Sequence, residues 1–353
     1  MPLLTTTIGS YPKPAGVSVP NWFDVRRSRS PGQWHPTQAY DHYLASAGGS
    51  NEAALDRGTE EIVREQVAAG IDVPTDGEIR REHYIYYQCR HLAGFDFASL
   101  TKKSMRQASW VAEVPTVRGP IKALNPILPR DWRAAQSATD NQVKITLPGP
   151  MTIIDSTADA FYGDERRLAA DLADALNTEI RALAEAGCRW IQIDEPLFAR
   201  EPAKALAFGV DLLARCFHGV PAAAKRAVHI CCGYPSALDL EVFPKADAAA
   251  YFDLSAALEA APIDAISLED AHQHNDLKLL ERFPTKTIML GLVGIARTRI
   301  ETVDEIRSRI ETALGHIDPH RLMAAPDCGL IMLDRARVVA KLKNLAAAAR
   351  MCG

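Results

Sequence analysis

The chain of 353 residues lacks the features that mark membrane and secreted proteins. No stretch approaches the roughly 18 consecutive apolar residues that a membrane-spanning helix needs, and the N-terminus has no charged start followed by an apolar segment. The seven cysteines are odd in number and scattered, which is typical of a reducing compartment rather than of a disulfide scaffold. These absences predict a cytoplasmic protein with free thiols.

The chain also lacks an excess of charge of either sign. Its formal net charge is −4, so it has neither the basic surface that nucleic acids attract nor the acidic tail that indicates disorder. We therefore expect neither nucleic-acid nor membrane partners. A Gly-rich turn after the first strand is missing as well, which counts against an open, doubly wound α/β sheet.

Eight short apolar segments are present, and each is followed by a helical pattern or an insertion. Such segments are typical of parallel strands that are buried on both faces. The strands are predicted near residues 5, 72, 144, 190, 228, 265, 287 and 323. The helices are predicted at 52–69, 165–186, 201–217, a region ending near 261, 274–283, 303–314 and 334–350. Eight β-α units predict an α/β protein with one (β/α)8 TIM barrel over residues 1–353.

Two long insertions interrupt this rhythm after the first and second strands. Residues 13–49 are rich in Pro, Gly, Ser and aromatic residues, and a loop of this length is usually functional. Residues 79–142 contain Arg80 and Arg81, a tyrosine cluster at 84, 86 and 87, and a predicted hairpin around residues 110–118. The arginines and tyrosines fit either a clamp for an anionic ligand or a solvated insertion held by aromatic packing.

Polar residues gather at the predicted carboxyl ends of the strands, where barrel active sites are built. They are Ser10, Asp76, Glu78, Asp194, Glu195, His229, Cys231, Glu269, Asp327 and Cys328. Packing does not readily explain the adjacent carboxylates Asp194 and Glu195 at a strand end before a proline. We therefore predict a functional role for at least Asp194.

The segment Ala227-Val-His-Ile-Cys-Cys-Gly233 indicates a metal site. Because successive strand side chains point to opposite faces, His229 and Cys231 share one face and Cys232 points to the other. Imidazole nitrogen and thiolate sulfur suit Zn²⁺, and a catalytic zinc site needs a third protein ligand and an open position. His-x-Cys alone is equally typical of a buried cysteine beside a hydrogen-bonded histidine.

Two later strand ends offer further ligands, Glu269 and Cys328. Thiolates argue against magnesium or calcium, and the spacing does not match an iron-sulfur cluster. If the carboxylate of Glu269 is exchangeable, an incoming thiol can take its place and lose its proton to become a nucleophile. This chemistry predicts an alkyl transfer to sulfur.

Seven strand-end sequences extend over nearly the whole chain. They are Thr7-Ile-Gly-Ser-Tyr-Pro12, Asp76-Gly-Glu78, Gly149-Pro150, Ile191-Gln-Ile-Asp-Glu-Pro196, His229-Ile-Cys231, Ser267-Leu-Glu269 and Pro326-Asp-Cys-Gly-Leu330. In this order they resemble the catalytic domain of cobalamin-independent methionine synthase in its stand-alone form.

The resemblance implies a methyltransferase that binds homocysteine and zinc and forms methionine. By motif, the implied zinc ligands are His229, Cys231, Glu269 and Cys328. The residues that the resemblance assigns to the homocysteine amino group and backbone are Ile8, Ser10, Glu78 and Asp194. Asp194 and Glu269 are the residues expected to be catalytic.

Two departures from the family concern the methyl donor. Asp155 and Ser156 stand where folate-using members have an Asn-Trp pair whose indole lies against the pterin. Gly294-Ile-Ala296 stands where the family usually has Asp-Ile-His, whose histidine is a proposed proton donor to the leaving group. Because the folate amine needs that proton, the departures favour methylcobalamin, another non-folate donor or a methyl-donating partner protein.

Three alternatives stay open. A zinc-thiol alkyltransferase similar to epoxyalkane:coenzyme M transferase has a sulfonate acceptor, which would not need Glu78 and Asp194 to hold an ammonium group. A barrel with purely structural zinc would have four closed ligands. A folate-dependent methionine synthase would need a substitute proton donor such as His272 or His274, although an exposed helix start also explains these two residues.

Overall fold

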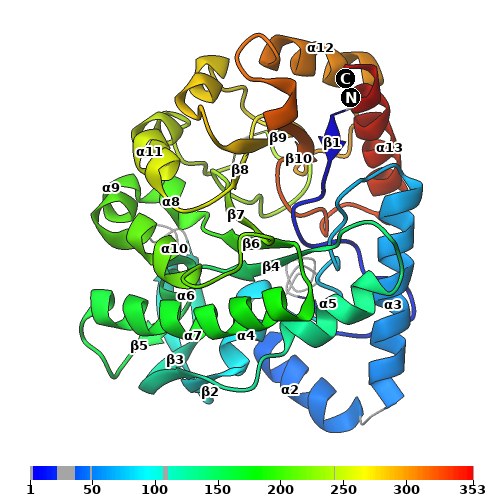
Figure 1. Cartoon of the computed structure of the whole chain (residues 1–353). Coiled ribbons are helices and arrows are strands. Elements are labelled where there is room, and N and C mark those ends of the chain that lie inside the picture. The colour runs from blue at the N-terminus through cyan, green and yellow to red at the C-terminus, as the bar shows by residue number, and fades with distance from the viewer. Residues whose placement is uncertain (1–2, 22–35, 48–49, 106–109, 242, 353) are drawn as a thin grey trace.

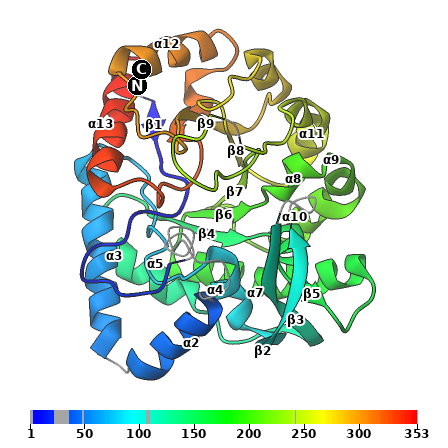
Figure 2. The same ribbon diagram turned by 180° about the vertical axis from the view of Figure 1, so that it is seen from behind.

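The computed structural model describes residues 3–21, 36–47, 50–105, 110–241 and 243–352. Within these residues, a curled parallel sheet of seven strands lies at the centre and helices surround it (Figures 1 and 2). The strand order is β1-β10-β9-β8-β7-β6-β4. These strands are β1 (Leu4–Thr5), β10 (Leu322–Pro326), β9 (Thr287–Val293), β8 (Ala265–Leu268), β7 (Lys225–Ile230), β6 (Trp190–Asp194) and β4 (Lys144–Pro148).

The two edges of this sheet are connected by two isolated parallel bridges. Thr6 bridges Val73, and Thr75 bridges Lys144 at the start of β4. The N–H of Val73 donates to β1 at 2.9 Å, and the N–H of Lys144 donates to the carbonyl of Pro74 at 2.8 Å. The strand predicted near residue 72 is thus reduced to two bridges, because Pro74 has no N–H for a continuous ladder.

The strands are buried on both faces, as parallel strands covered by helices should be. Every residue of β4, β6, β8 and β10 is buried. One small core cluster consists of Ile8, Val73, Trp190, Ala227, Ala265, Met289, Met323 and Ala325. The main core includes the alternate strand residues and the apolar sides of the helices. Each large apolar side chain buried in this way contributes roughly 1.5 to 3 kcal/mol.

The helices between the strands begin and end where their sequences predict. Helix α7 (Glu165–Ala186) begins at Asp164, whose side chain accepts two backbone N–H groups, and ends at Gly187 with φ 111°. Helix α12 (Val303–Ala313) begins with a capping box at Thr302. The others around the sheet are α3 (Ser50–Ala68), α5 (Leu128–Gln136), α6 (Pro150–Ser156), α8 (Leu197–Arg200), α9 (Pro202–Lys204), α10 (Val210–Cys216), α11 (Ala249–Ala260) and α13 (Arg335–Met351). None of the helices in the described residues is long and apolar enough to cross a membrane.

Two predicted helices take a different form. The segment predicted as a helix over 201–217 is divided into α9, a π-helical turn (Ala205–Gly209) and α10. The segment predicted over 274–283 contains a 3-10 helix, Leu277–Arg282, which begins at Asp276. Pro284 disfavours helical backbone at the residue before it, so this helix has no room to extend.

The second insertion forms a small three-stranded sheet within the described residues. Strand β2 (Leu92–Met105) pairs antiparallel with β3 (Trp110–Ala123), and the short β5 (Ala158–Asp159) joins β3. The hairpin predicted around residues 110–118 is therefore wrong in extent, since that stretch is only part of one arm. Register shifts in β2, between Ala93 and Phe95 and again before Thr101, break the alternation that would have marked the other arm.

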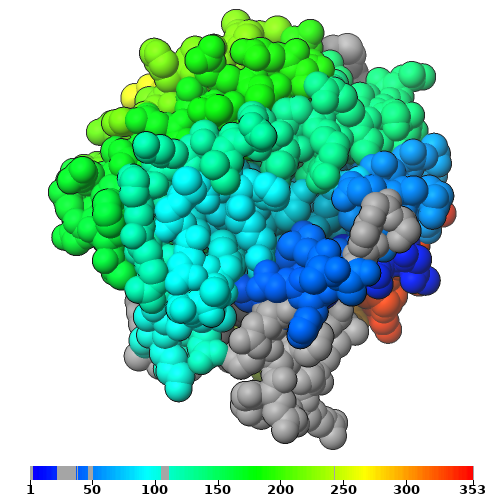
Figure 3. All heavy atoms as spheres, turned by 90° about the horizontal axis from the view of Figure 1, so that it is seen from below, coloured from blue at the N-terminus to red at the C-terminus, as the bar shows by residue number. Residues whose placement is uncertain are grey.

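Helix α4 (Tyr84–Arg90) and helix α2 (Pro36–Ala47) connect the two insertions. Arg90 of α4 forms an ion pair with Asp41 of α2 at 2.6 Å and also donates to the carbonyl of Thr37. Figure 3 shows this face, where the second insertion (cyan) lies beside α2 (blue). In the first insertion, Trp22, Phe23 and Trp34 lie outside the described residues.

Candidate active site

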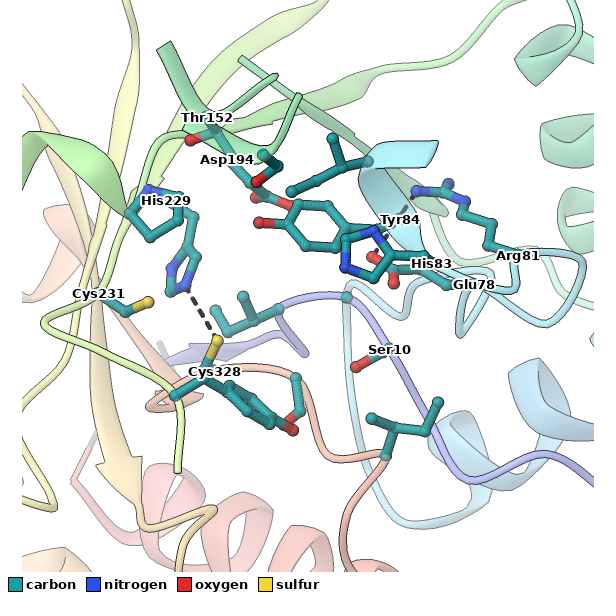
Figure 4. A pocket seen from close by; sticks show the side chains of 18 of the residues that line it. Ser10, Glu78, Arg81, His83, Tyr84, Thr152, Asp194, His229, Cys231 and Cys328 are labelled. Carbon is teal, nitrogen blue, oxygen red and sulfur yellow. Dashed lines mark hydrogen bonds and ion pairs between the residues drawn. The ribbon is translucent and has the colours of Figure 1, made fainter. Parts of the chain in front are cut away.

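A pocket at the carboxyl ends of the strands contains most of the predicted site residues (Figure 4). Those that line it are Ile8, Ser10, Glu78, Asp194, His229, Cys231 and Cys328. They come from distant parts of the sequence and meet because all strands of a parallel curled sheet end on one side. Of the predicted set, all of which lies in the described residues, only Glu269 does not line this pocket.

The potential metal ligands His229, Cys231 and Cys328 form one compact group. One ligand atom from each lies within 4.8 Å of the others. The Nε2 of His229 is 3.3 Å from the Sγ of Cys328, and its Nδ1 is hydrogen-bonded to the Oγ of Ser267 at 2.9 Å. A hydrogen bond to the second ring nitrogen is the usual way in which a metal-binding histidine is oriented. One imidazole and two thiols at this spacing fit a zinc ion.

The two thiols of this group have opposite pKa shifts. The hydrogen bond between the two sulfurs lowers the pKa of Cys231 and raises that of Cys328. Burial disfavours the imidazolium, but the hydrogen bond and charge of Cys231 outweigh it and raise the pKa of His229. The lowered pKa of Cys231 favours the thiolate, the form of cysteine that binds metals.

Glu269 lies next to this group but outside it. Its carboxylate is buried, and one oxygen accepts the backbone N–H of Cys232 at 3.1 Å. The other oxygen forms an ion pair with Lys245. The structure thus brings three of the four predicted ligands together, and the fourth, Glu269, forms an ion pair with Lys245.

Three other polar residues at the strand ends have structural contacts. Cys232 is buried in the main core, as the alternation along the strand predicts, and burial raises its pKa to about 11. Glu195 accepts the backbone N–H groups of Met151 and Thr152 at 3.0 Å and so caps helix α6. Asp327 accepts the three successive backbone N–H groups of residues 270–272 at 2.8 to 2.9 Å.

Two buried carboxylates, Asp194 and Glu78, lie across the pocket from the thiols (Figure 4). Asp194 accepts from Gln192 at 2.7 Å, and Glu78 accepts from the hydroxyl of Thr146 at 2.8 Å. Burial raises the pKa of both, that of Asp194 to about 7. Two half-satisfied carboxylates in a pocket form a suitable site for an ammonium group.

The backbone around Glu78 and Ser10 is shaped for close approach. Glu78 itself has φ 56°, an uncommon value for a residue with a side chain. A Cβ at Gly9 would lie 2.7 Å from a carboxylate oxygen of Glu78, and one at Gly329 would lie 2.2 Å from the hydroxyl of Ser10. Glycine at both positions lets the loops after β1 and β10 approach Glu78 and Ser10 closely in the pocket wall.

Sequence reasoning missed a part of the pocket wall formed by α4 and the residue before it. His83 stacks between Tyr84 and Tyr86, with ring centroids 5.5 and 4.4 Å apart. Burial raises the pKa of Tyr84 well above its usual value, so its hydroxyl stays neutral. The sequence contained a signal for this wall, the tyrosine cluster of the second insertion, but not its position over the thiols.

Arg80 and Arg81 are not solvated, because both side chains are buried in ion pairs, and Arg81 also lines the thiol pocket. Arg80 contacts Glu52 at 2.7 Å and Asp131 at 3.5 Å. Arg81 donates to the carbonyl of Thr146 at 2.9 Å and contacts Asp76 and Glu78. These arginines hold the second insertion on the sheet, and their charges are balanced within the protein.

The histidines after Glu269 lie away from the thiol pocket. His272 packs on Phe243 with ring centroids 4.6 Å apart, and burial lowers its pKa to about 4. The side chain of His274 is 66% exposed and lies 3.5 Å from Asp270. Both line a second pocket beside α12, and the helix that was expected to start here begins only at Leu277.

The two departures that concern the donor differ in location. Asp155 and Ser156 line the thiol pocket, and Asp155 forms an ion pair with Arg200 at 2.8 Å. Gly294 lines the second pocket, and its carbonyl accepts from the buried Lys341 at 3.0 Å. A charged pair, Asp155 with Arg200, therefore lines the thiol pocket.

Comparison with known proteins identifies relatives over almost the whole chain. Residues 3–351 match the family model described as the catalytic domain of cobalamin-independent synthase. A methionine synthase of Saccharolobus solfataricus is 30% identical over 352 residues, which cover 98% of this chain and 93% of the relative. A methionine synthase of Sulfolobus acidocaldarius is 29% identical over 346 residues, with 97% and 90% covered.

A solved structure gives the same result in three dimensions. The B12-independent methionine synthase of Shewanella sp. W3-18-1, in complex with selenomethionine, superimposes with a TM-score of 0.85 and is 30% identical. The match covers 99% of this chain and 98% of that one. The chain belongs to the cobalamin-independent methionine synthase family, a family of methyltransferases.

Proposed function

We propose that this chain transfers a methyl group to the thiol of L-homocysteine at a zinc site and so forms methionine. The observation that carries this proposal is the union, in one pocket, of the group His229, Cys231 and Cys328 with the carboxylates Glu78 and Asp194. The first set suits zinc and a substrate thiol, and the second suits an amino-acid ammonium group. The names of the relatives and the selenomethionine complex of the Shewanella enzyme agree with such a substrate.

The reaction makes one bond and breaks one. A lone pair of the homocysteine sulfur forms a bond to the methyl carbon, and the electron pair of the donor-methyl bond leaves with the donor. Zinc, when bound, keeps a coordinated thiol deprotonated at neutral pH. Ser267 fixes the ring of His229, and Glu78 and Asp194 orient the amino acid so that its sulfur lies at the cysteine side.

We propose a methyl donor other than methyltetrahydrofolate, either methylcobalamin, another non-folate donor or a methyl-donating protein. The Asp155–Arg200 ion pair occupies the donor side of the pocket, where folate-using members have an indole. His272 and His274 line the second pocket and not the thiol pocket, which supports a leaving group that needs no proton from them. A cobalt leaving group needs no proton, whereas a folate amine does.

Three alternatives have less support. A sulfonate acceptor, as in epoxyalkane:coenzyme M transferase, would meet two buried carboxylates of its own sign. Folate-dependent methionine synthesis has less support because Asp155 and Ser156 line the pocket in place of the Asn-Trp pair. A closed structural zinc site would need a fourth ligand that stays on the metal, whereas Glu269 has Lys245 as a competing partner.

We also propose that residues 1–353 form a single (β/α)8 barrel domain. The bridges at Val73 and Thr75 join β1 to β4 at the place where an eighth strand would lie. With this segment counted as the second strand, the insertions at 13–49 and 79–142 follow the first and second strands. The active-site pocket then lies on the barrel face that enzymes of this fold use.

The donor assignment is tested with zinc-loaded protein and homocysteine, offered methylcobalamin and methyltetrahydrofolate side by side. We expect methionine from methylcobalamin and little or none from the folate, since a missing general acid typically reduces the rate by about 10² to 10⁴. Folate-dependent turnover at an ordinary rate would overturn the donor assignment. Failure to form methionine with either donor, together with no binding of homocysteine, would overturn the acceptor.

A further inference from the structure

Lys245 holds the carboxylate of Glu269 in place beside the three metal ligands. One oxygen of Glu269 forms the ion pair with this lysine, while the other accepts the N–H of Cys232 at 3.1 Å. The side chains are 10% and 3% exposed, so water screens the pair very little. A buried carboxylate with these two contacts is stable without a metal.

The position of Lys245 is set by the backbone of the loop after β7. The N–H of Ala246 donates to the carbonyl of Cys232 at 2.7 Å, which folds this part of the loop back onto the end of the strand. Gly233, with φ 148°, has the carbonyl of Pro244 only 2.9 Å from its Cβ position. Lys245 also lies over the ring of Phe243, with its ammonium 5.1 Å from the centroid.

The ammonium of Lys245 is also close to the metal group. The charges of Asp327, Cys231 and Cys328 all act on it, and burial, the largest influence, lowers its pKa. The loop that carries Lys245 begins directly after Cys231, and the backbone N–H that holds Glu269 belongs to the next residue. Glu269 is thus held between Lys245 and the backbone of the residue next to Cys231, where the metal group and the lysine are the two available partners for its carboxylate.

The geometry points to Lys245 as the positioning residue that competes with zinc for the carboxylate of Glu269 and so keeps the fourth ligand position available for the substrate thiol. This inference rests on the proposed function, because it assumes zinc and homocysteine at this site. With zinc bound, Glu269 would be its ligand in the absence of a thiol and would pair with Lys245 when a thiol takes its place. Lys245 does not line the thiol pocket and would act through Glu269.

Lys245→Met tests this competition in the full-length protein. Lys245 is the cation that pairs with Glu269 in the part of the chain that the structure describes. In its absence we expect zinc to bind about tenfold more tightly in competition with a chelating dye. Homocysteine should bind the zinc-loaded variant about tenfold more weakly by calorimetry, because Glu269 no longer leaves readily. Lys245→Arg, which keeps the charge, should lie close to the wild type in both measurements.

The control is to measure the effect of Lys245→Met a second time in protein that also carries Glu269→Gln. Removing a positive charge near the site favours zinc in any case, and this general effect persists in the double variant Lys245→Met/Glu269→Gln. The additional gain that depends on Glu269 should disappear there, and homocysteine binding should lose its sensitivity to residue 245. A purely structural role for Lys245 would change zinc affinity equally in both backgrounds.

Cobalt in place of zinc gives a readout in the unaltered protein. Adding homocysteine should raise the thiolate-to-cobalt absorption as a third sulfur joins the site, and the rise should need more homocysteine in Lys245→Met. If the wild type binds zinc and homocysteine but Lys245→Met leaves both affinities unchanged, the role of Lys245 is refuted. If the wild type binds no homocysteine, the proposed function fails instead.

Discussion

Cys231 and Cys328 lie in one compact group with His229, and in our proposal each supplies one metal ligand. With Cys231→Ser or Cys328→Ser, we expect the zinc content of the purified protein to fall from about one ion per chain to a small fraction. The adjacent Cys232→Ser is the matched control, because Cys232 is packed in the main core and should not affect zinc. Metal analysis after gel filtration measures all three, and full zinc retention in both ligand variants would refute the assignment.

Glu78 and Asp194 act, in our proposal, on the amino group and not on the metal. Glu78→Gln and Asp194→Asn should therefore keep zinc but raise the KM for homocysteine about tenfold or more, since a charge-assisted hydrogen bond contributes roughly 1.5 to 3 kcal/mol. Steady-state kinetics at saturating donor, with zinc content measured in parallel, test this. Unchanged KM in both variants would indicate an acceptor without an amino group.

The raised pKa of Asp194 makes homocysteine binding depend on pH. Burial raises this pKa to about 7, and only the ionised carboxylate attracts an ammonium group. Below about pH 7 the carboxyl takes up a proton, so the Kd for homocysteine should rise by roughly tenfold for each unit that the pH falls. Calorimetry from pH 8 to 5.5 measures this trend. In Asp194→Asn this part of the pH dependence should vanish, and a wild-type profile in that variant would contradict it.

At the scale of elements, helix α7 illustrates how a local signal stabilises the fold. The side chain of Asp164 accepts the N–H groups of Arg166 and Arg167 at 3.0 and 3.2 Å. Asp164→Ala should reduce the free energy of unfolding by about 1 kcal/mol, with a range of about 0.5 to 2, as measured in urea. Asp164→Asn keeps a capping oxygen and should cost little, so an equal loss in both variants would exclude capping as the cause.

The ends of other elements depend on contacts from outside. Pro74 reduces the second predicted strand to two bridges, and the hairpin arm β2 is irregular although its partner β3 pairs along it. These segments have no clear period of two, so the sequence pattern does not determine how far their strand pairing extends. Pairing with β1, β4 and β3 nevertheless supplies hydrogen bonds to their backbone. This pairing forms only when strands that are distant in the sequence come together.

At the scale of the whole molecule, the proposed metal site joins two strands that are not neighbours in the sheet, β7 and β10. His229 lies in β7 and Cys328 follows β10, so a bound ion should stabilise the fold as any ligand of the native state does. Free zinc at a hundred times its Kd should add about 2.7 kcal/mol and raise the Tm by several degrees in a single transition. Calorimetry with and without a chelator tests this. Cys328→Ser should show no rise, and an equal rise in that variant would place the ion elsewhere.

The sequence by itself determined the features that depend on near neighbours. Alternation along a strand placed His229 and Cys231 on one face and Cys232 on the other, and the structure agrees. Helical periodicity and caps located α7, α12 and α13, because the side chains that matter lie within a few residues of each other. The family could also be recognised from the sequence, because its motifs are short segments at strand ends.

Only the tertiary structure decided which charges are paired. Two ion pairs, Arg81–Asp76 and Lys245–Glu269, form because loops fold back onto the strand ends. The same holds for Tyr84, whose place in the pocket wall follows from the packing of the second insertion. Ion pairs and pocket walls form between residues that are close in space but belong to different loops. A local sequence pattern does not indicate which loops come into contact. The carboxylate of Glu269 was therefore predictable as a candidate ligand, but its attachment to a lysine was not.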